Sequence, residues 1–277
     1  MSLRINTNVQ SIAAQRHLGV NHNLQNKALE RLSSGSRINR AADDAAGLAI
    51  SEKLKANIRS IKQASRNASD GISLVQVAEG SMNEISNILT RLRELSIQSA
   101  SDTIGDVERG FINKEVGGLK SEIDRISLTT EFNGRKLLDG KGEDLEIQVG
   151  LKNNIFEDRL QFKSKSLATS LQSLGLTAVD NATKENSQKN LEYIDDAIRR
   201  VNENRSELGA MQNRLQSTIN NQAIYRENLE AANSRIRDTD IAEETSEATK
   251  ANILTQSTIS VLGQANNNAS MALKLLS

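Results

Sequence analysis

The stretch from Asp44 to Ala100 contains no proline, and its apolar residues recur every seven positions. They form two rows set three positions apart: the first comprises Leu54, Ile61, Ala68, Val75, Met82 and Leu89, and the second comprises Ala64, Ala78, Ile85 and Leu92. Because seven residues make almost two turns of an α-helix, both rows fall on one helix face. At about 1.5 Å per residue the helix would be roughly 85 Å long, far longer than the helices of most compact domains. The stretch therefore predicts a long helix that needs a long partner along its whole length.

A second stretch, from about Thr183 to Arg237, has the same period and a similar length. A shorter amphipathic helix is expected from about Val107 to Leu128. Between residues 132 and 163 the strand-like alternation and the turn dipeptide Asn133-Gly134 predict one or two small hairpins at which the chain turns round. The two long helices should then lie antiparallel, with the shorter helix as a third member. The register of the second long helix holds Ile194, Val201, Leu208, Leu215, Gln222, Leu229 and Ile236.

The two ends of the chain have weaker apolar patterns. Residues 2–33 are dense in Asn and Gln, and the last segment places apolar residues at alternating spacings of three and four. Helices of this kind become ordered against a partner, and the simplest partner for each end is the other. Apolar ends that become ordered only against other copies of the chain are typical of a polymer subunit. We expect the polymerisation seam to comprise Ile5, Val9, Ile12, Leu262, Ala265, Ala269, Ala272 and Leu276.

The predicted fold class is mainly α: a long antiparallel coiled-coil-like helical rod, with a small β-hairpin region at one end and paired terminal helices. Residues 1–43 and 239–277 should form the two halves of the terminal helical domain. Residues 44–181 should form the first part of the rod domain with its β-hairpins and a short linker, and residues 182–238 its C-terminal helix.

Charge and composition exclude several classes of function. Lys and Arg together number 35, as do Asp and Glu, so the net charge is zero. A neutral chain is a poor binder of nucleic acid or of anionic membranes, since both require a positive field. There is no cysteine, no secretory signal at the N-terminus and no apolar run long enough to insert into a membrane. We therefore expect a chain that stays in the cytoplasm or leaves by a route that reads no cleaved signal peptide.

No constellation of residues predicts catalysis, a cofactor or a metal. His17 and His22 are five positions apart, whereas zinc-binding histidines on a helix are three or four apart. Asp43 and Asp44 are best explained as N-cap and first-turn residues of the long helix that follows. Arg91, with Arg93 and Glu94, is most simply part of a solvated face. The chain is therefore expected to be no enzyme.

Several long motifs nevertheless resemble those of bacterial flagellins, in their order along the chain. They include residues 5–8 (INTN), 29–50 (LERLSSGSRINRAADDAAGLAI), 91–95 (RLREL), 122–126 (EIDRI), 132–134 (FNG) and 234–242 (SRIRDTDIA). The resemblance covers roughly residues 1–150 and 182–277. The large variable outer domains of longer flagellins are missing here or reduced to a linker.

The resemblance implies a subunit that self-polymerises into the extracellular flagellar filament and serves motility, with the terminal helices lining an inner tube. It implies type III export without a cleaved signal peptide. The implied partners are further copies of the chain, an export chaperone, the filament cap and the hook-junction proteins. It also implies that the vertebrate Toll-like receptor that senses flagellin binds the monomer through Arg91, Leu95 and Glu115.

Three alternatives stay open from the sequence. A hook–filament junction protein shares the terminal helices, although the motifs at residues 37–44 and 93–95 favour flagellin. A secreted adhesin or effector is another possibility. A flagellin that carries a peptidase is disfavoured because residues 150–182 contain no histidine and are too few for an enzyme.

Overall fold

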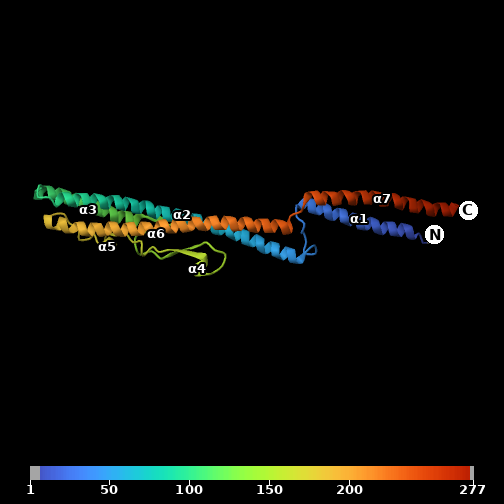
Figure 1. Cartoon of the computed structure of the whole chain (residues 1–277), viewed down its shortest axis with the longest axis horizontal. Coiled ribbons are helices and arrows are strands. Elements are labelled where there is room, and N and C mark those ends of the chain that lie inside the picture. Colours follow the sequence, from blue (N-terminus) through green and yellow to red (C-terminus); the bar gives the residue numbers. More distant parts are fainter. Residues whose placement is uncertain (1–6, 275–277) are drawn as a thin grey trace. The chain divides into compact units, whose positions relative to one another are not determined.

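The computed structural model describes residues 7–274, without the side chains of Ala269 and residues 272–274. Most described residues are helical, and the strands are short (Figure 1). The chain divides into two compact units. One unit comprises Asn57–Glu227, and the other comprises Met1–Ala56 with Asn228–Ser277. The main helices are α1 (Val9–Ser34), α2 (Ala45–Ser99), α3 (Asp106–Thr129), α6 (Lys184–Arg237) and α7 (Ile241–Lys274).

Within the unit 57–227, α2 and α6 lie antiparallel. Arg93, near the end of α2, pairs with Asp195, near the start of α6, at 2.7 Å. Gly71, in the middle of α2, lies against Leu215, further along α6. The antiparallel arrangement predicted from the two registers is therefore confirmed. The residues buried along the shared face are Ile61, Ala64, Ala68, Val75, Ala78, Met82, Ile85, Leu89 and Leu92 of α2, and Ile194, Val201, Leu208 and Leu215 of α6.

The third helix of this unit, α3, buries Ile112, Val116 and Ile123 in the same core. The chain reaches it through a tight turn that a buried arginine stabilises. The Arg109 guanidinium donates to the carbonyl oxygens of Ser99 and Ser101 and pairs with Asp106 at 2.9 Å. It thereby satisfies the carbonyl of Ser99, the last residue of α2, and that of Ser101 in the turn that follows.

Two antiparallel hairpins follow α3, as the alternating pattern predicts. The first pairs β1 (Glu131–Phe132) with β2 (Arg135–Lys136), and its turn places Asn133 and Gly134 at φ of 50° and 76°. The second pairs β3 (Leu145–Gln148) with β4 (Arg159–Phe162) through the short helix α4 (Ile155–Asp158). Another short helix, α5 (Leu171–Leu174), lies in the segment that leads to α6. In the turn of the first hairpin, the left-handed φ of Asn133 and Gly134 explains the Asn-Gly sequence, because these two residue types adopt left-handed φ most readily.

The position of the hairpins corrects one prediction. They lie against the middle of α2 and α6 (Figure 1) and do not lie at one end of the helices. Asn67 of α2 donates to the Gln148 carbonyl at 3.0 Å, and Gln222 of α6 donates to the Val149 carbonyl. The reason is the direction of α3, which runs back along α2 and ends beside Val77. The chain therefore enters the hairpins halfway along the long helices.

Gly71 makes this docking testable. A Cβ built there would lie 2.7 Å from Ile147 Cδ1, so the absence of a side chain lets β3 approach α2. We expect Gly71→Val to lower the free energy of unfolding by about 1–3 kcal/mol, because overpacking outweighs the gain in helix propensity. A Cβ at Gly80 of the same helix meets nothing within 4 Å. Urea unfolding should therefore show Gly80→Ala to be as stable as the parent chain or more so, and an unaffected Gly71→Val would contradict the docking.

In the other unit, the two connecting segments lie side by side. Ser36 and Asp238 form a β-bridge. The Arg37 amide donates to the Arg237 carbonyl at 2.7 Å, and the Thr239 amide donates to the Gly35 carbonyl at 3.0 Å. These bonds fix where the chain leaves α1 and where it enters α7.

Candidate assembly surface on the terminal helices

The terminal helices α1 and α7 pair antiparallel (Figure 1). Near the start of α1, Asn8 Nδ2 donates to the Ala265 carbonyl at 2.9 Å. Near its end, Arg31 pairs with Glu244 at 3.4 Å, so residue numbers on α7 fall as those on α1 rise. The predicted pairing of the two ends of the chain is confirmed for the described residues.

Small and polar side chains make up most of the seam between the two helices, and Leu18, Leu32 and Leu262 are its large apolar members. The residues that face the partner helix recur at alternating spacings of three and four, as in a coiled coil. They are Ser11, Ala14, Leu18, Asn21, Gln25, Ala28 and Leu32 on α1, and Glu244, Ala248, Ala251, Thr255, Thr258, Leu262 and Ala265 on α7. Such a seam buries little apolar area, so it contributes far less hydrophobic stabilisation than the core of the other unit.

Most of the large apolar side chains of the same helices lie outside the seam. Val9 is 64% exposed and Ile253 is 58% exposed. This is the reverse of an ordinary amphipathic helix pair, which buries its large apolar side chains between the helices. We call the following residues the outer apolar surface: Val9, Ile12, Val20, Leu24 and Leu29 of α1, and Ile241, Ile253, Leu254, Ile259, Val261 and Met271 of α7. Each would contribute about 1.5–3 kcal/mol if it became fully buried.

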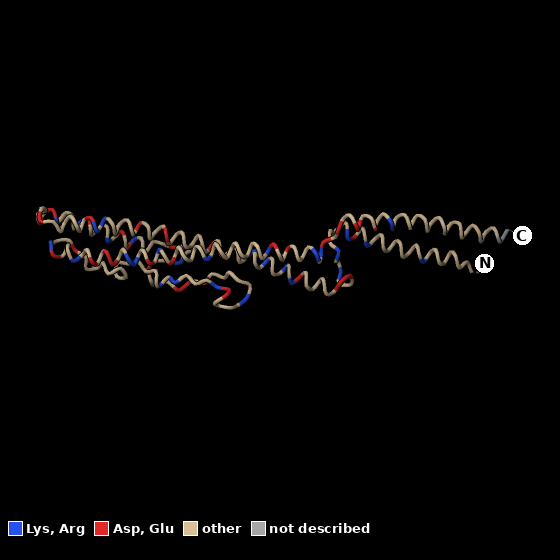
Figure 2. The backbone as a smooth tube through the Cα atoms, viewed as in Figure 1, with Lys and Arg blue, Asp and Glu red and all other residues tan. Residues whose placement is uncertain are grey.

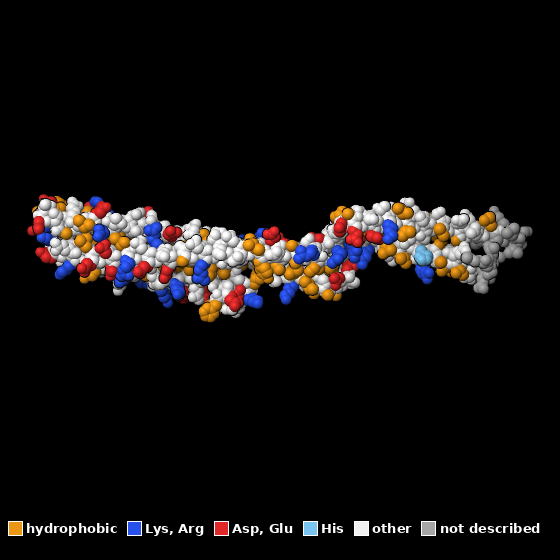
Figure 3. Space-filling view, in the orientation of Figure 1, with side chains coloured by type: hydrophobic (Ala, Val, Ile, Leu, Met, Phe, Trp, Pro, Cys, Tyr) orange, Lys and Arg blue, Asp and Glu red, His pale blue; other side chains and the backbone are white. Residues whose placement is uncertain are grey.

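Charge is absent from much of this surface. No Lys, Arg, Asp or Glu lies between Lys250 and Lys274 of α7, or between Arg16 and Lys27 of α1. Figure 2 shows the corresponding stretches of backbone without charged residues, and Figure 3 shows hydrophobic side chains along the visible face of both helices. An uncharged surface can be covered by protein without the free-energy cost of removing charges from water.

A groove of about 560 Å³ runs along the junction of α1 and α7. Ala13 and His17 line its α1 side, and Leu254 and Val261 line its α7 side. It offers a concave apolar site for a side chain from outside the pair.

The predicted seam residues divide into three groups. Val9 and Ile12 belong to the outer apolar surface. Leu262 is half-buried and Ala265 is buried, and both face α1. The remaining four predictions fall outside what the structure describes: Ile5 and Leu276 lie beyond the described residues, and the side chains of Ala269 and Ala272 are not described.

The sequence prediction missed most of the outer apolar surface. Val20 lies eight residues after Ile12, and Val261 lies seven after Leu254, so each pair shares a helix face. This second apolar stripe on each helix could have predicted the outer apolar surface from the sequence.

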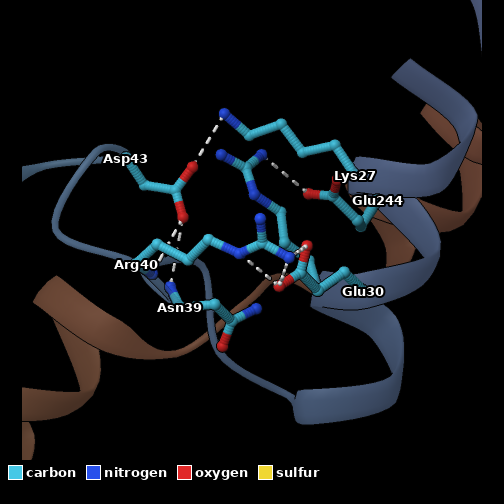
Figure 4. Close-up of polar contacts among 7 residues, drawn as sticks. Lys27, Glu30, Asn39, Arg40, Asp43 and Glu244 are labelled. Atoms are coloured by element: carbon cyan, nitrogen blue, oxygen red, sulfur yellow. Dashed lines mark hydrogen bonds and ion pairs between the residues drawn. The ribbon is translucent and has the colours of Figure 1, made fainter. Parts of the chain in front are cut away.

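A network of charged residues joins α1 to the loop before α2 (Figure 4). Lys27 Nζ lies 2.9 Å from Asp43 Oδ1, while Asp43 Oδ2 accepts from the amides of Asn39 and Arg40 at 3.3 and 3.1 Å. The hydrogen bond from Lys27, aided by that from Arg40, lowers the pKa of Asp43 from 3.8 to about 2. The expected capping role is therefore divided: Asp44 accepts from the Gly47 amide at 2.8 Å and caps α2, whereas Asp43 fixes the loop.

The depressed pKa of Asp43 predicts a pH dependence for this loop. Because the folded-state pKa lies below 3.8, the contribution of Asp43 to stability is complete above that pH and is lost as pH falls towards 2. We expect hydrogen exchange at residues 39–44 to be slower in the parent chain than in Asp43→Asn at pH 6. The difference should shrink between pH 4 and pH 2. Equal exchange at pH 6 would show that the carboxylate does not hold the loop.

The residues assigned to receptor binding lie in the other unit. Arg91 donates from Nε and Nη2 to Glu115 Oε1 at 3.1 and 3.0 Å, and from Nη1 to Glu94 at 3.1 Å. These three side chains are exposed. Leu95 is only 2% exposed and packs in the core, so the structure brings together Arg91 and Glu115 but not the Leu95 side chain at the surface.

Residues 7–274 contain neither a metal-site cluster nor a helix that could cross a membrane. No group of three or more His, Cys, Asp or Glu side chains in this part of the chain has the arrangement of a metal site. None of its helices combines the length and the apolar character needed to cross a membrane.

Comparisons with known proteins match almost the whole chain. The protein-family model of the bacterial flagellin N-terminal helical region matches residues 5–143, and the family model of the C-terminal helical region matches residues 191–276. The chain is 46% identical over 272 residues to a flagellin of Halalkalibacterium halodurans, covering 98% of this chain and 99% of the relative. It is 41% identical over 288 residues to the flagellar filament 30.7 kDa core protein of Treponema maltophilum, covering 99% of each. The crystal structure of Bacillus cereus flagellin matches with a TM-score of 0.51 and 32% identity, covering 57% of this chain and 88% of that one.

Proposed function

Because the chain belongs to the bacterial flagellin family, we propose that its copies polymerise into the flagellar filament by packing their outer apolar surfaces against one another. The single observation that carries this proposal is the reversed amphipathicity of α1 and α7. Most of their large apolar side chains are exposed, while the seam consists mainly of small and polar side chains. So many exposed large apolar side chains on one helix pair mark an interaction site.

Zero net charge supports the same function, since it leaves little repulsion between identical copies. The outer apolar surface has a second consequence before assembly. It must be covered during export, and an export chaperone on α7 fits that requirement. The filament cap and the hook-junction proteins would then contact the same helices at the two ends of the filament.

Polymerisation of purified protein tests the proposal. Electron microscopy after a rise in protein concentration or salt should show long filaments for the parent chain. Val20→Asp should prevent them, because the charge would be buried between copies. Its monomer should melt as the parent does, because Val20 is already exposed. Gln15→Glu adds the same charge at an exposed polar position of α1 and serves as the control. Normal filaments from Val20→Asp would contradict the proposal, and a hook–filament junction protein would give no long filaments at all.

The exposed cluster of Arg91, Glu94 and Glu115 favours a second function. We propose that the dissociated monomer is recognised by the vertebrate Toll-like receptor for flagellin through this cluster. Leu95 would act from beneath it, by packing α2 against the core.

A reporter-cell assay with monomeric protein tests this recognition. We expect Arg91→Ala to lower the response at least tenfold. Arg199→Ala is the matched control, since Arg199 is an exposed arginine that also pairs with two carboxylates, those of Asp196 and Glu203. No response to the parent monomer, or equal responses for the two variants, would overturn this second proposal.

A further inference from the structure

The tip of the second hairpin carries the most exposed large apolar side chain in the described part of the chain. Phe156 of α4 is 94% exposed, and Ile155 beside it is 50% exposed. Figure 3 shows a hydrophobic projection at the place of α4 in Figure 1. We call Ile155, Phe156 and Glu157 the knob.

Hydrogen bonds hold the knob in a defined shape. Asp158, which is buried, accepts from the Asn154 amide at 3.0 Å through its carboxylate. Its carbonyl accepts from the amides of Val149 and Gly150 at 2.8 and 2.9 Å. Asn154 Oδ1 accepts from the Phe156 amide at 3.1 Å. The chain therefore orders the loop that presents Phe156, although Phe156 itself packs little against the same molecule.

The outer face of α3 shows the complementary anomaly. Gly110, Gly117 and Gly118 lie inside the helix, where each glycine destabilises by roughly 0.8–1.0 kcal/mol relative to alanine. A Cβ at any of the three would meet nothing within 4 Å. As at Gly80 of α2, no neighbour within the described molecule requires a glycine at these positions, but on α3 three such glycines lie in one helix beside exposed apolar side chains.

The same face carries exposed apolar side chains and a positive charge. Val107 and Phe111 are 69% and 63% exposed, and Lys114 Nζ lies 5.8 Å from the centre of the Phe111 ring. Spacings of three, four and seven residues place all these positions on one side of the helix. We call Val107, Gly110, Phe111, Lys114, Gly117 and Gly118 the notch.

The knob cannot reach the notch of its own molecule. The hairpin docks on α2 at Asn67, whereas the notch lies beside Arg91, which pairs with Glu115 of α3. These two positions of α2 are about 36 Å apart at 1.5 Å per residue.

We infer that the knob of one copy packs into the notch of the next. The occupant is a second copy because the two surfaces carry complementary groups: the exposed Phe156 ring and Glu157 on the knob can meet the exposed Phe111 ring and Lys114 on the notch, where three glycines present no side chain. A contact between two different surfaces of identical chains is heterologous, and such contacts build open polymers. This inference rests on the proposed filament function. It adds a second interface between copies, formed by the unit 57–227, to the one formed by the outer apolar surface.

Cysteine cross-linking tests the inference cleanly, because the chain contains no cysteine of its own. Full-length Phe156→Cys and Gly117→Cys would be mixed, polymerised and oxidised with copper and phenanthroline. We expect a disulfide-linked dimer of twice the 30.3 kDa chain mass in mixed filaments, and none in filaments of either variant alone. Ile97→Cys, at an exposed position of α2, replaces Phe156→Cys in the control mixture. Mixed filaments without a dimer above this control would overturn the inference, while the filament function itself would stand. Failure of the parent chain to polymerise would instead remove the function on which the inference rests.

A second measurement separates the notch from a purely structural role of its glycines. Gly117→Gln should raise the melting temperature of the monomer by about 2–4 °C, because helix propensity improves. The same variant should raise the critical concentration for polymerisation at least tenfold. Gly80→Gln offers the same gain at an exposed position of α2 and should leave the critical concentration unchanged. An unchanged critical concentration for Gly117→Gln would contradict the notch.

Discussion

We expect the chain that lacks residues 241–277 to form no filaments under any condition in which the parent chain polymerises. The deletion removes α7 and with it more than half of the residues of the outer apolar surface. It also leaves α1 without its partner, and an isolated helix with so weak a seam is marginal in water. Sedimentation and electron microscopy after a salt jump would measure the loss.

The same deletion should leave the other unit folded. Every residue of the main core cluster lies between Ala68 and Leu215, outside the deleted segment. Thermal unfolding followed by circular dichroism should therefore retain a cooperative transition close to that of the parent chain. Leu262→Asp, which places a charge in the α1–α7 seam, should reduce polymerisation in a similar way. Normal filaments from the truncated chain would show that the terminal pair is not the assembly element.

The second large effect concerns the core of the unit 57–227. Leu89 is 0% exposed and lies in the first apolar row of α2. We expect Leu89→Ala to lower the free energy of unfolding by about 2–5 kcal/mol, because it removes buried methyl groups and leaves a cavity. Guanidinium unfolding would measure the change.

Ile97→Ala provides the matched control, since Ile97 is on the same helix but is 49% exposed. We expect it to change stability by less than about 1 kcal/mol. If both variants lost the same stability, the assignment of the apolar rows to a buried face would be wrong.

The long helices were predictable because a single strong signal, the seven-residue period, specifies both their length and their buried face. Met82 and Leu208 are buried as their rows require. The short strands were also predictable, since Ile147 and Leu160 alternate with polar residues and pair with each other.

The place of the hairpins was not predictable from local pattern. It depends on α3 running back along α2, which follows from the turn at Arg109 and not from any feature of the hairpin sequence. The seven-residue period could have predicted the burial of Leu95, because Ile88 lies seven positions earlier and packs on the same core. The resemblance of residues 91–95 to a flagellin motif instead suggested that Leu95 binds a receptor.

The candidate assembly surface was predicted in part. Val9 and Ile12 were identified, but Val20 and Ile253 were not, because an apolar stripe is normally assigned to the buried side of a helix. Here the stripe that faces the partner helix consists mainly of small and polar residues. Only the pairing of α1 with α7 reveals which side remains for other copies.

A cryo-electron microscopy map of the assembled filament would show which side of each terminal helix contacts other copies. We expect Val20 and Ile253 each to contact a neighbouring subunit, while Ala14 and Ala251 still face the partner helix of the same chain. A map in which Val20 and Ile253 face solvent, with α1 and α7 separated from one another, would contradict this expectation.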